Sequence, residues 1–413
     1  MTLYRSFRDE MMAGGATGDA PPTPKRSTAL VSGAAIVALL VWLAITNIWS
    51  FVLVIGLLVS VFLHEVGHFV TAGWAGMKRT QVFMGFGPKL WSTHRNGVEY
   101  GVRALPLGAF VRIVGMNNLD PVEPGDEKVA YSSKPYRWRL LVITAGSIMH
   151  VIIAVLIMLF VYTTGGRYQE TGVVRVFAIT ENSPAANAGI QLDDVIVSVG
   201  GQPIDSIEDL SATIGSLGAG ERTVVGYERD GVASSVEVTL IERPSEPGSG
   251  AGYFGVGTDS WGRDRLGPLD GFTHVMGDLW TGMGRTFSGI GTVINPANQW
   301  DQLTNDEADP AKRPTTVVGV TKVAGDIGER EGFYGVLEIL ASINVFVGLF
   351  NLLPLLPFDG GHAAIATYER IRSRRGREYR VDVEKMWPAT VVVVTLLMFL
   401  TFTGLYLDLT RPF

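Results

Sequence analysis

Long apolar stretches alternate with polar ones along the chain, and each approaches or exceeds the length of a membrane span. They run from Ala29 to Val70, Leu140 to Thr163, Val336 to Pro357 and Pro388 to Leu407. About 20 helical residues cross the hydrocarbon core of a bilayer. The first stretch is roughly twice that length, so the pattern predicts a polytopic α-helical membrane protein with about five crossings.

A polar break lies near the middle of the first stretch, at Thr46-Asn47-Ile48-Trp49-Ser50. The break favours a hairpin of two spans, and one long helix is the alternative. Residues 1–28, which include Pro21-Pro22-Thr23-Pro24, are expected to form a disordered N-terminus on the cytoplasmic side. A cleaved signal peptide is not expected, because the apolar stretch continues into the sequence His64-Glu65-Val66-Gly67-His68.

The charges beside the spans predict the orientation. The segment from Met77 to Arg139 carries twice as many basic as acidic residues, and Arg370 to Lys385 is densely basic. Both are expected in the cytoplasm. Gly165 to Gly335 has about twice as many acidic as basic residues, so we expect it on the outer side of the plasma (inner) membrane.

Composition supports the membrane interpretation and narrows the chemistry. Of the 413 residues, 47% are hydrophobic and none is cysteine. Disulfides and thiolate metal sites are therefore excluded, and any metal must use histidine and carboxylate ligands. The net charge of −6 gives no support for nucleic-acid binding.

The sequence His64-Glu65-Val66-Gly67-His68 forms an H-E-x-x-H motif inside the first apolar stretch. Positions i and i+4 share one face of a helix, so His64 and His68 can bind one metal ion while Glu65 takes a proton from metal-bound water. Ionisable residues at membrane depth are costly and are usually functional. The alternative is that this end of the helix lies at the cytoplasmic membrane surface, where Glu65 and His68 are simply in contact with water.

A third ligand must come from another segment. Asp359 is the candidate, because it follows two helix-breaking residues, Pro354 and Pro357, at the end of the third stretch. His362 is the alternative ligand, and a simple capping role is the alternative for Asp359.

These two motifs together resemble the site-2 proteases, a family of intramembrane zinc metalloproteases. The family pairs H-E-x-x-H on one transmembrane helix with N-x-x-P-x-x-x-x-D-G on another, and this chain matches both, the second from Asn351 to Gly360. The chain resembles in particular the bacterial branch that includes the regulator of sigma-E protease and its actinobacterial relatives, which carry an extracytoplasmic PDZ domain. The resemblance implies Zn²⁺ bound by His64, His68 and Asp359, Glu65 as general base, and Asn351 as a substrate-binding residue.

Further residues are candidates for contact with the substrate. Asn344 lies two helical turns before Asn351, and it either faces the site or forms an ordinary interhelical hydrogen bond. Gly85-Phe86-Gly87 and the segment from Glu99 to Val111 predict short strands. This β-loop is expected on the cytoplasmic side of the membrane, where it either pairs with an unwound substrate or forms a hairpin without substrate contact.

Three residues depart from the family pattern. Family members commonly have glycine where Ala109 stands, and A-G-P-x-x-N where this chain has Ala145-Gly146-Ser147-Ile148-Met149-His150. His150 either replaces the asparagine as a hydrogen-bonding group or is only packed.

The region from 171 to 243 is expected to fold as one extracytoplasmic, α/β-mixed domain. Ser183-Pro184 and Ser206 mark helix starts, and Asp230-Gly231 marks a hairpin. The sequence around Asn182 to Ile196 resembles the PDZ domains of bacterial proteases. Such a domain binds a peptide or strand, or it excludes substrates with bulky outer domains. Residues 244–335 are expected to form a linker, an amphipathic helix from Gly271 to Ile294 on the outer membrane surface, and a loop from Pro296 to Pro314.

The sequence therefore predicts an intramembrane zinc endopeptidase, organised as segments 29–163, 171–243, 244–335 and 336–413. The resemblance implies regulated proteolysis of single-pass membrane proteins, either anti-sigma factors or remnant signal peptides, with membrane lipid as a further partner. A transporter or other metal-binding membrane protein, and an inactive PDZ scaffold, are the alternatives.

Overall fold

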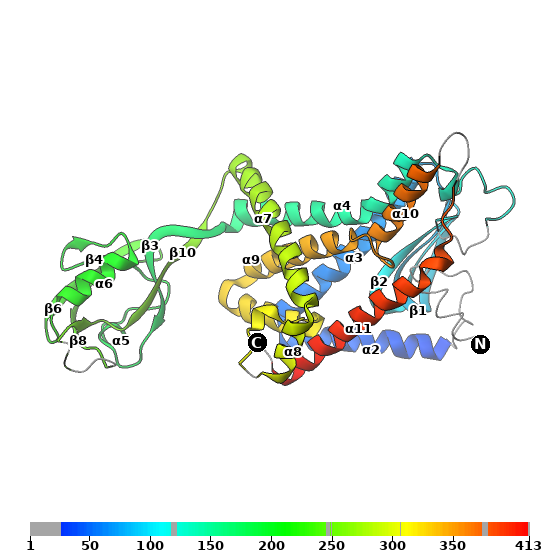
Figure 1. Cartoon of the computed structure of the whole chain (residues 1–413). Coiled ribbons are helices and arrows are strands. Elements are labelled where there is room, and N and C mark those ends of the chain that lie inside the picture. The colour runs from blue at the N-terminus through cyan, green and yellow to red at the C-terminus, as the bar shows by residue number, and fades with distance from the viewer. Residues whose placement is uncertain are drawn as a thin grey trace. The chain divides into compact units, whose positions relative to one another are not determined.

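The computed structural model describes residues 26–116, 122–244, 248, 250–305, 307–373 and 379–411. The chain divides into two compact units (Figure 1). Unit 1 comprises residues 1–159 and 272–413, and unit 2 comprises residues 160–271. The predicted N-terminal segment 1–28 lies almost entirely outside the described residues.

Unit 1 is a bundle of long apolar helices with a small sheet. Four helices among the described residues are long and apolar enough to cross a membrane, which supports a polytopic membrane protein. They are α3 (Ile48–Trp74), α4 (Tyr136–Phe160, continued by a π-helical turn, Val161–Gly165), α9 (Val317–Asn351) and α11 (Trp387–Thr410). The described apolar part of α2 (Arg26–Thr46) covers only Gly33–Thr46, which is shorter than a span.

The first apolar stretch is divided into two helices at Asn47. This residue has extended backbone angles, and its side chain accepts a hydrogen bond from the backbone N–H of Ser50, at 2.9 Å. Asparagine is among the best N-cap residues because its side-chain oxygen satisfies a free N–H of the first turn. The structure therefore has two helices separated at Asn47 and not one long helix, which agrees with the break predicted from the sequence.

Helices α3 and α9 pack closely because small residues lie between them. A Cβ at Gly56 of α3 would lie 2.5 Å from Leu340, and one at Gly328 of α9 would lie 2.2 Å from Trp49. Ser50 Oγ donates a hydrogen bond to the carbonyl oxygen of Thr321, at 2.7 Å. Small residues and hydroxyl groups allow such close approach between membrane helices, where no hydrophobic effect drives association.

The sheet of unit 1 is built from two long, bent strands, β1 (Arg79–Arg95) and β2 (Val98–Ile113). Val82 pairs with both Tyr100 and Val111, whereas Arg95 pairs with Val98. Each strand therefore contributes two segments to one sheet, whose edge segments 105–113 and 89–95 pair antiparallel with their neighbours while the two central segments run parallel to each other. Asn96 and Gly97, both with positive φ, form the tight turn between β1 and β2.

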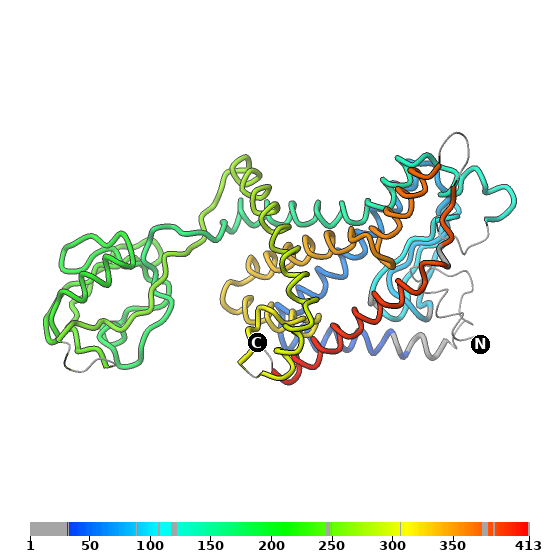
Figure 2. Tube along the Cα trace, in the orientation of Figure 1, coloured from blue at the N-terminus to red at the C-terminus, as the bar shows by residue number. Residues whose placement is uncertain are grey.

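The third predicted span begins earlier and ends earlier than the sequence suggested. Helix α9 starts at Val317, because Thr316 caps it, and it has a kink at Gly332 (φ 66°, ψ −151°). The sequence predicts the start of this span at Val336, because the residues before it are polar. Asn351 is the last helical residue, and an irregular turn leads to α10 (Asp359–Arg372) (Figure 2).

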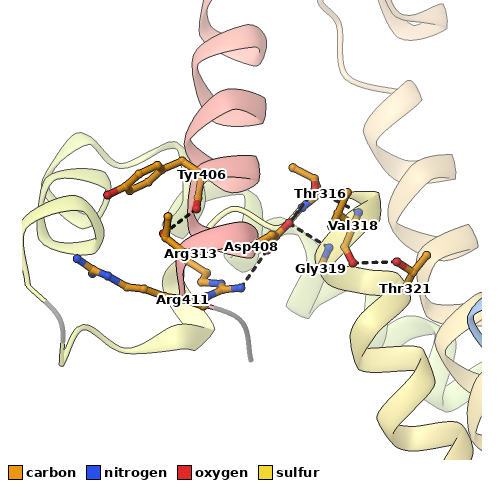
Figure 3. Close-up of polar contacts among 9 residues, drawn as sticks. Arg313, Thr316, Val318, Gly319, Thr321, Tyr406, Asp408 and Arg411 are labelled. Carbon is orange, nitrogen blue, oxygen red and sulfur yellow. Dashed lines mark hydrogen bonds and ion pairs between the residues drawn. The ribbon is translucent and has the colours of Figure 1, made fainter. Parts of the chain in front are cut away.

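A buried ion pair joins Asp408, near the end of α11, to Arg313 in the segment that precedes α9 (Figure 3). Asp408 accepts hydrogen bonds from Arg313 Nη2 at 2.9 Å, from the hydroxyl of Thr316 at 2.7 Å and from the backbone N–H groups of Thr316 and Gly319. The Asp408 side chain is 0% exposed and that of Arg313 is 5% exposed. A carboxylate at a helix N-terminus is favoured by the free N–H groups there.

The predicted loop from Pro296 to Pro314 is partly helical. It contains α8 (Pro296–Thr304) and a 3-10 turn (Pro310–Lys312), and it follows the amphipathic helix α7 (Pro268–Ile294). Asn295 caps α8 by accepting a hydrogen bond from the N–H of Ala297, at 3.0 Å. The sequence interpretation missed this Asn-Pro start because the segment that follows is short and polar.

Unit 2 is an α/β-mixed domain with a six-stranded antiparallel sheet in the order β10-β3-β4-β6-β7, with β5 beside β4. Its helices are α5 (Pro184–Asn187) and α6 (Ile207–Ser216), capped by Ser183 and Ser206 as predicted. Its strands are β3 (Arg167–Ile179), β4 (Val195–Val199), β5 (Gln202–Pro203), β6 (Arg222–Arg229), β7 (Val232–Thr239) and β10 (Val256–Asp264), with a separate pair β8 (Ile241–Glu242) and β9 (Gly252–Tyr253).

The sheet of unit 2 extends beyond the predicted limits of 171 and 243. Strand β10 pairs along most of β3, from Val256 opposite Ile179 to Asp264 opposite Arg167. The polar linker before β10 had suggested the end of the domain. The hairpin between β6 and β7 turns at Asp230 and Gly231 as predicted, and both have positive φ.

We expect Asp408→Asn to destabilise unit 1 strongly. The amide cannot replace a carboxylate that accepts from Arg313 and from Thr316, so a buried guanidinium loses its charge partner. The expected loss is about 3–5 kcal/mol of unfolding free energy, measured by thermal unfolding of the full chain in detergent.

Asp382→Asn is the matched control, because Asp382 pairs with Lys385 at 3.3 Å on an exposed surface. Its expected cost is about 0–1 kcal/mol. Equal unfolding temperatures for the two variants would show that the buried pair does not stabilise the fold.

Candidate active site

His64 and His68 lie on one face of α3, one helical turn apart, and both are buried. Their Nε2 atoms are 3.1 Å apart. Asp359, the first residue of α10, places its Oδ2 atom 3.4 Å from each of these two nitrogens. The structure therefore brings together the three residues that the sequence motifs selected as metal ligands, from two helices far apart in the sequence.

The three donor atoms fit a zinc ion. Ligands at about 2.0–2.1 Å around a tetrahedral zinc lie about 3.4 Å from one another, which matches the observed separations. Asp359 Oδ2 is buried and accepts no hydrogen bond from the residues that the structure describes. Among the residues that the structure describes, His64, His68 and Asp359 are the one group with this metal-binding arrangement, and His362 is not part of it.

Helix α4 orients the imidazole of His68. His68 Nδ1 lies 2.7 Å from the carbonyl oxygen of Val142. A carbonyl can only accept, so Nδ1 carries the proton and Nε2 is left with a free lone pair toward Asp359. The carbonyl of Val142 thus fixes the tautomer that a metal ligand requires.

A glycine on α4 makes room for both imidazoles. A Cβ at Gly146 would lie 2.4 Å from His64 Cε1 and 2.5 Å from the Nε2 atoms of His64 and His68. Gly67 of α3 has the reverse role, because a Cβ there would lie 2.7 Å from the carbonyl oxygen of Ala145. The two helices approach each other so closely only because both positions lack a side chain.

Glu65 lies between the two histidines in sequence, and its carboxylate is within hydrogen-bonding reach of the backbone of Val111 in β2. Val111 belongs to the edge segment 105–113 of the sheet. This contact places the sheet edge beside the H-E-x-x-H turn.

Asn344 connects three helices. Its Nδ2 donates to Ser60 Oγ on α3 at 3.1 Å and to the carbonyl oxygen of Leu340 at 2.8 Å, while its Oδ1 accepts from His150 Nδ1 on α4 at 2.8 Å. These contacts use both amide hydrogens, and the residue is 1% exposed. The geometry therefore matches the interhelical alternative more closely than a substrate-binding role.

His150 is also buried, and its ring centroid lies 5.0 Å from that of His64. It uses its side chain for hydrogen bonding and is not merely packed. Ser147, the other departure on α4, has a buried hydroxyl without a hydrogen-bond partner.

The remaining residues that the sequence suggested for substrate binding lie either shortly before Asp359 in the sequence or in the sheet of unit 1. Asn351 ends α9, before the turn that leads to Asp359. Gly85 and Gly87 have positive φ where β1 bends, and Phe86 stacks on Phe110 with ring centroids 6.1 Å apart. Sequence reasoning missed the roles of Val142 and Gly146, since neither a carbonyl group nor a steric gap leaves a signal in one sequence.

A helical membrane bundle in which an H-E-x-x-H helix meets a distant aspartate has the construction of an intramembrane zinc metalloprotease. The comparison with known families agrees. The chain belongs to peptidase family M50, whose model matches residues 52–399. It is therefore a membrane metalloendopeptidase of the site-2 type with Zn²⁺ as cofactor, as predicted, and the transporter alternative is not supported.

Curated relatives resemble the chain over most of its length. The zinc metalloprotease Rip1 of Mycobacterium tuberculosis is 34% identical over 407 residues, which cover 89% of this chain and 98% of the relative. Rip1 of Mycolicibacterium smegmatis is 33% identical, covering 87% and 96%. A putative zinc metalloprotease of Agrobacterium fabrum is 28% identical, covering 78% and 86%.

Among solved structures, the PDZ domain of the SdrC-like protein of Listeria monocytogenes is 19% identical, covering 22% of this chain and 90% of that domain, with a TM-score of 0.19. A solution structure of a Geobacillus thermodenitrificans protein is 30% identical, covering 20% and 98%, with a TM-score of 0.18. These scores are too low to assign a fold.

We expect Gly146→Ala to abolish zinc binding and cleavage, because the added methyl group occupies the space of both imidazoles. Zinc per protein, measured by elemental analysis, should fall at least about tenfold, with a corresponding loss of cleavage.

Gly282→Ala on α7 is the matched control, because its added Cβ meets no atom within 4 Å. It should keep full zinc content and activity. A Gly146→Ala protein with normal zinc content would contradict the close approach of α4.

Proposed function

We propose that His64, His68 and Asp359 hold the catalytic zinc ion and that Glu65 is the general base. The observation that carries this proposal is the convergence of three buried donor atoms at tetrahedral spacing, next to the one carboxylate of the H-E-x-x-H turn. The proposed reaction is hydrolysis of a peptide bond within or beside the transmembrane helix of a single-pass protein.

When bound, zinc supplies Lewis-acid polarisation of the scissile carbonyl and lowers the pKa of a water molecule. Glu65 takes the proton from the attacking water and later donates it to the leaving amine. The backbone of Val111 orients the Glu65 carboxylate. The carbonyl of Val142 keeps the His68 proton on Nδ1, so that Nε2 remains a ligand throughout.

The sheet is suited to present the substrate in extended form. No strand other than β1 pairs with segment 105–113 among the described residues, and its Val111 lies beside Glu65. A transmembrane helix has all its backbone groups bonded internally, so it must unwind before hydrolysis. A sheet edge that pairs with no other strand compensates the released N–H and C=O groups by strand addition.

Glycines give this sheet its shape. A Cβ at Gly85 would lie 2.7 Å from the carbonyl oxygen of Leu105, so a larger residue would separate the two strands where they bend. Gly85, Phe86 and Gly87 therefore support the edge, and Asn351 is proposed to bind the substrate backbone near Asp359.

The proposed substrates are single-pass membrane proteins of the anti-sigma-factor or remnant-signal-peptide type. The resemblance of the motifs to site-2 proteases supports this class. Unit 2 is proposed to be a PDZ-like domain that either binds a peptide strand or excludes substrates with bulky outer domains.

The proposed location is the plasma (inner) membrane, with the active site toward the cytoplasm and unit 2 outside. The basic residues flanking α4 and α10 support this orientation, because positively charged segments stay on the cytoplasmic side. His68 lies six residues before the end of α3, or about 9 Å along the helix, which is consistent with a site near one membrane surface.

We expect Glu65→Gln to keep its zinc and to lose at least about 100-fold in cleavage rate, because an amide cannot accept the proton from water. Asp359→Ala should lose both zinc and activity. The assay uses the full chain in detergent with a model single-span substrate, together with elemental analysis.

Glu208→Gln is the control, since Glu208 is exposed on α6 of unit 2. Normal cleavage by Glu65→Gln would exclude Glu65 as the base. A native protein that binds zinc and cleaves no membrane substrate would instead support the inactive-scaffold alternative.

A further inference from the structure

A cavity of about 610 Å³ lies in unit 1 between the start of α4 and the end of α10. Its lining includes four basic residues, Lys134, Arg139, Arg370 and Arg380, and one acidic residue, Glu369. The excess of positive charge is therefore three. No residue of the proposed zinc site lines this cavity.

The one acidic side chain in the cavity lining, that of Glu369, forms its hydrogen bonds with other residues of the lining and its surroundings. Glu369 is 4% exposed, and it accepts hydrogen bonds from Arg139 Nη2 at 2.7 Å and from the backbone N–H of Val381 at 3.0 Å. Arg380 lies 3.6 Å from the same carboxylate and donates to the carbonyl oxygen of Ser132 at 2.7 Å. Glu369 thus holds the arginines in place while neutralising only one positive charge.

The other two cations are available for an external anion. Within the described residues, Lys134 and Arg370 form no ion pair with an acidic side chain, and Arg370 is exposed. The Nε atom of Arg139 is buried without a hydrogen-bond partner. Clustered N–H donors of this kind bind an oxyanion with several acceptor oxygens, such as a phosphate group.

The position of the cavity identifies the source of the anion. Tyr136 begins the apolar helix α4 and lines the cavity, so the cavity lies at the level where a membrane span ends. Tyrosine and basic residues at that level meet the lipid headgroups. Basic residues clustered beside the end of a transmembrane helix bind anionic lipid headgroups.

We propose that this cavity binds the phosphate group of an anionic membrane phospholipid. The cations of Lys134 and Arg370 contact the phosphate, and the Glu369–Arg139 pair orients the wall. A soluble phosphate ion shares the same chemistry, and the experiment separates the two sources.

The full chain in detergent is titrated with dioleoylphosphatidylglycerol or dioleoylphosphatidylcholine, and bound lipid is counted by native mass spectrometry. The two lipids have the same acyl chains and differ in net charge. We expect preferential binding of phosphatidylglycerol. The double variant Lys134→Gln/Arg370→Gln should weaken that binding about 30-fold and leave phosphatidylcholine binding unchanged.

Arg222→Gln/Arg243→Gln, in unit 2, is the matched control because it removes the same charge from residues that do not line the cavity. It should bind phosphatidylglycerol like the native chain. Thermal unfolding of all variants in phosphatidylcholine checks that each is folded.

Equal binding of the two lipids by the native chain, or an unchanged preference in the folded Lys134→Gln/Arg370→Gln variant, would overturn the proposal. Displacement of phosphatidylglycerol by an equimolar amount of inorganic phosphate would overturn the assignment to a lipid. A preference that is lost only in the cavity variant, and that resists inorganic phosphate, would support it.

Discussion

The close approach of α3 and α4 is the constraint on which the proposed catalytic centre depends. Two imidazoles must turn toward Asp359 inside an apolar bundle, where an unpartnered polar atom is costly. Gly146 leaves the space for the rings, and the carbonyl of Val142 accepts a hydrogen bond from His68 Nδ1, which leaves the Nε2 atom of His68 free. A single methyl group at Gly146 would fill the space of the donor atoms. The packing of α3 against α4 therefore also determines whether the two histidines can bind a metal ion.

The third donor depends on α9 in a different way. This helix is anchored at its start by Asp408 and in its middle by Asn344, which bonds to both α3 and α4. The turn after Asn351 then has a defined starting point, and Gly360 fits against the carbonyl oxygen of Leu352 only because it lacks a side chain. The position of Asp359 is thus set by interactions along the whole length of α9, and not by its own neighbours alone.

The sequence predicted best what is encoded locally. The Asn47 cap, the Asp230-Gly231 hairpin and the i, i+4 histidine pair each depend on a few adjacent residues. Asp359 was a candidate ligand because it follows Pro354 and Pro357 at the end of an apolar stretch, and the family motif then supported its pairing with these histidines. The double pairing of Val82, the addition of β10 to β3 and the steric role of Gly146 were not predicted, because each depends on contacts between segments whose separation in space no single sequence reveals.

The departures on α4 show how the bundle tolerates a changed motif. Without the proline of the family pattern, α4 continues as a regular helix through Ser147 and His150. The imidazole of His150 reaches Asn344, and Gly348 of α9 accommodates it, since a Cβ there would lie 3.0 Å from the Cβ of His150. A larger side chain on one helix thus faces a glycine on the other. Because a buried histidine without a partner would be costly, this pairing makes Asn344 and His150 depend on each other, and substitution of either leaves a buried polar atom of the other without its partner.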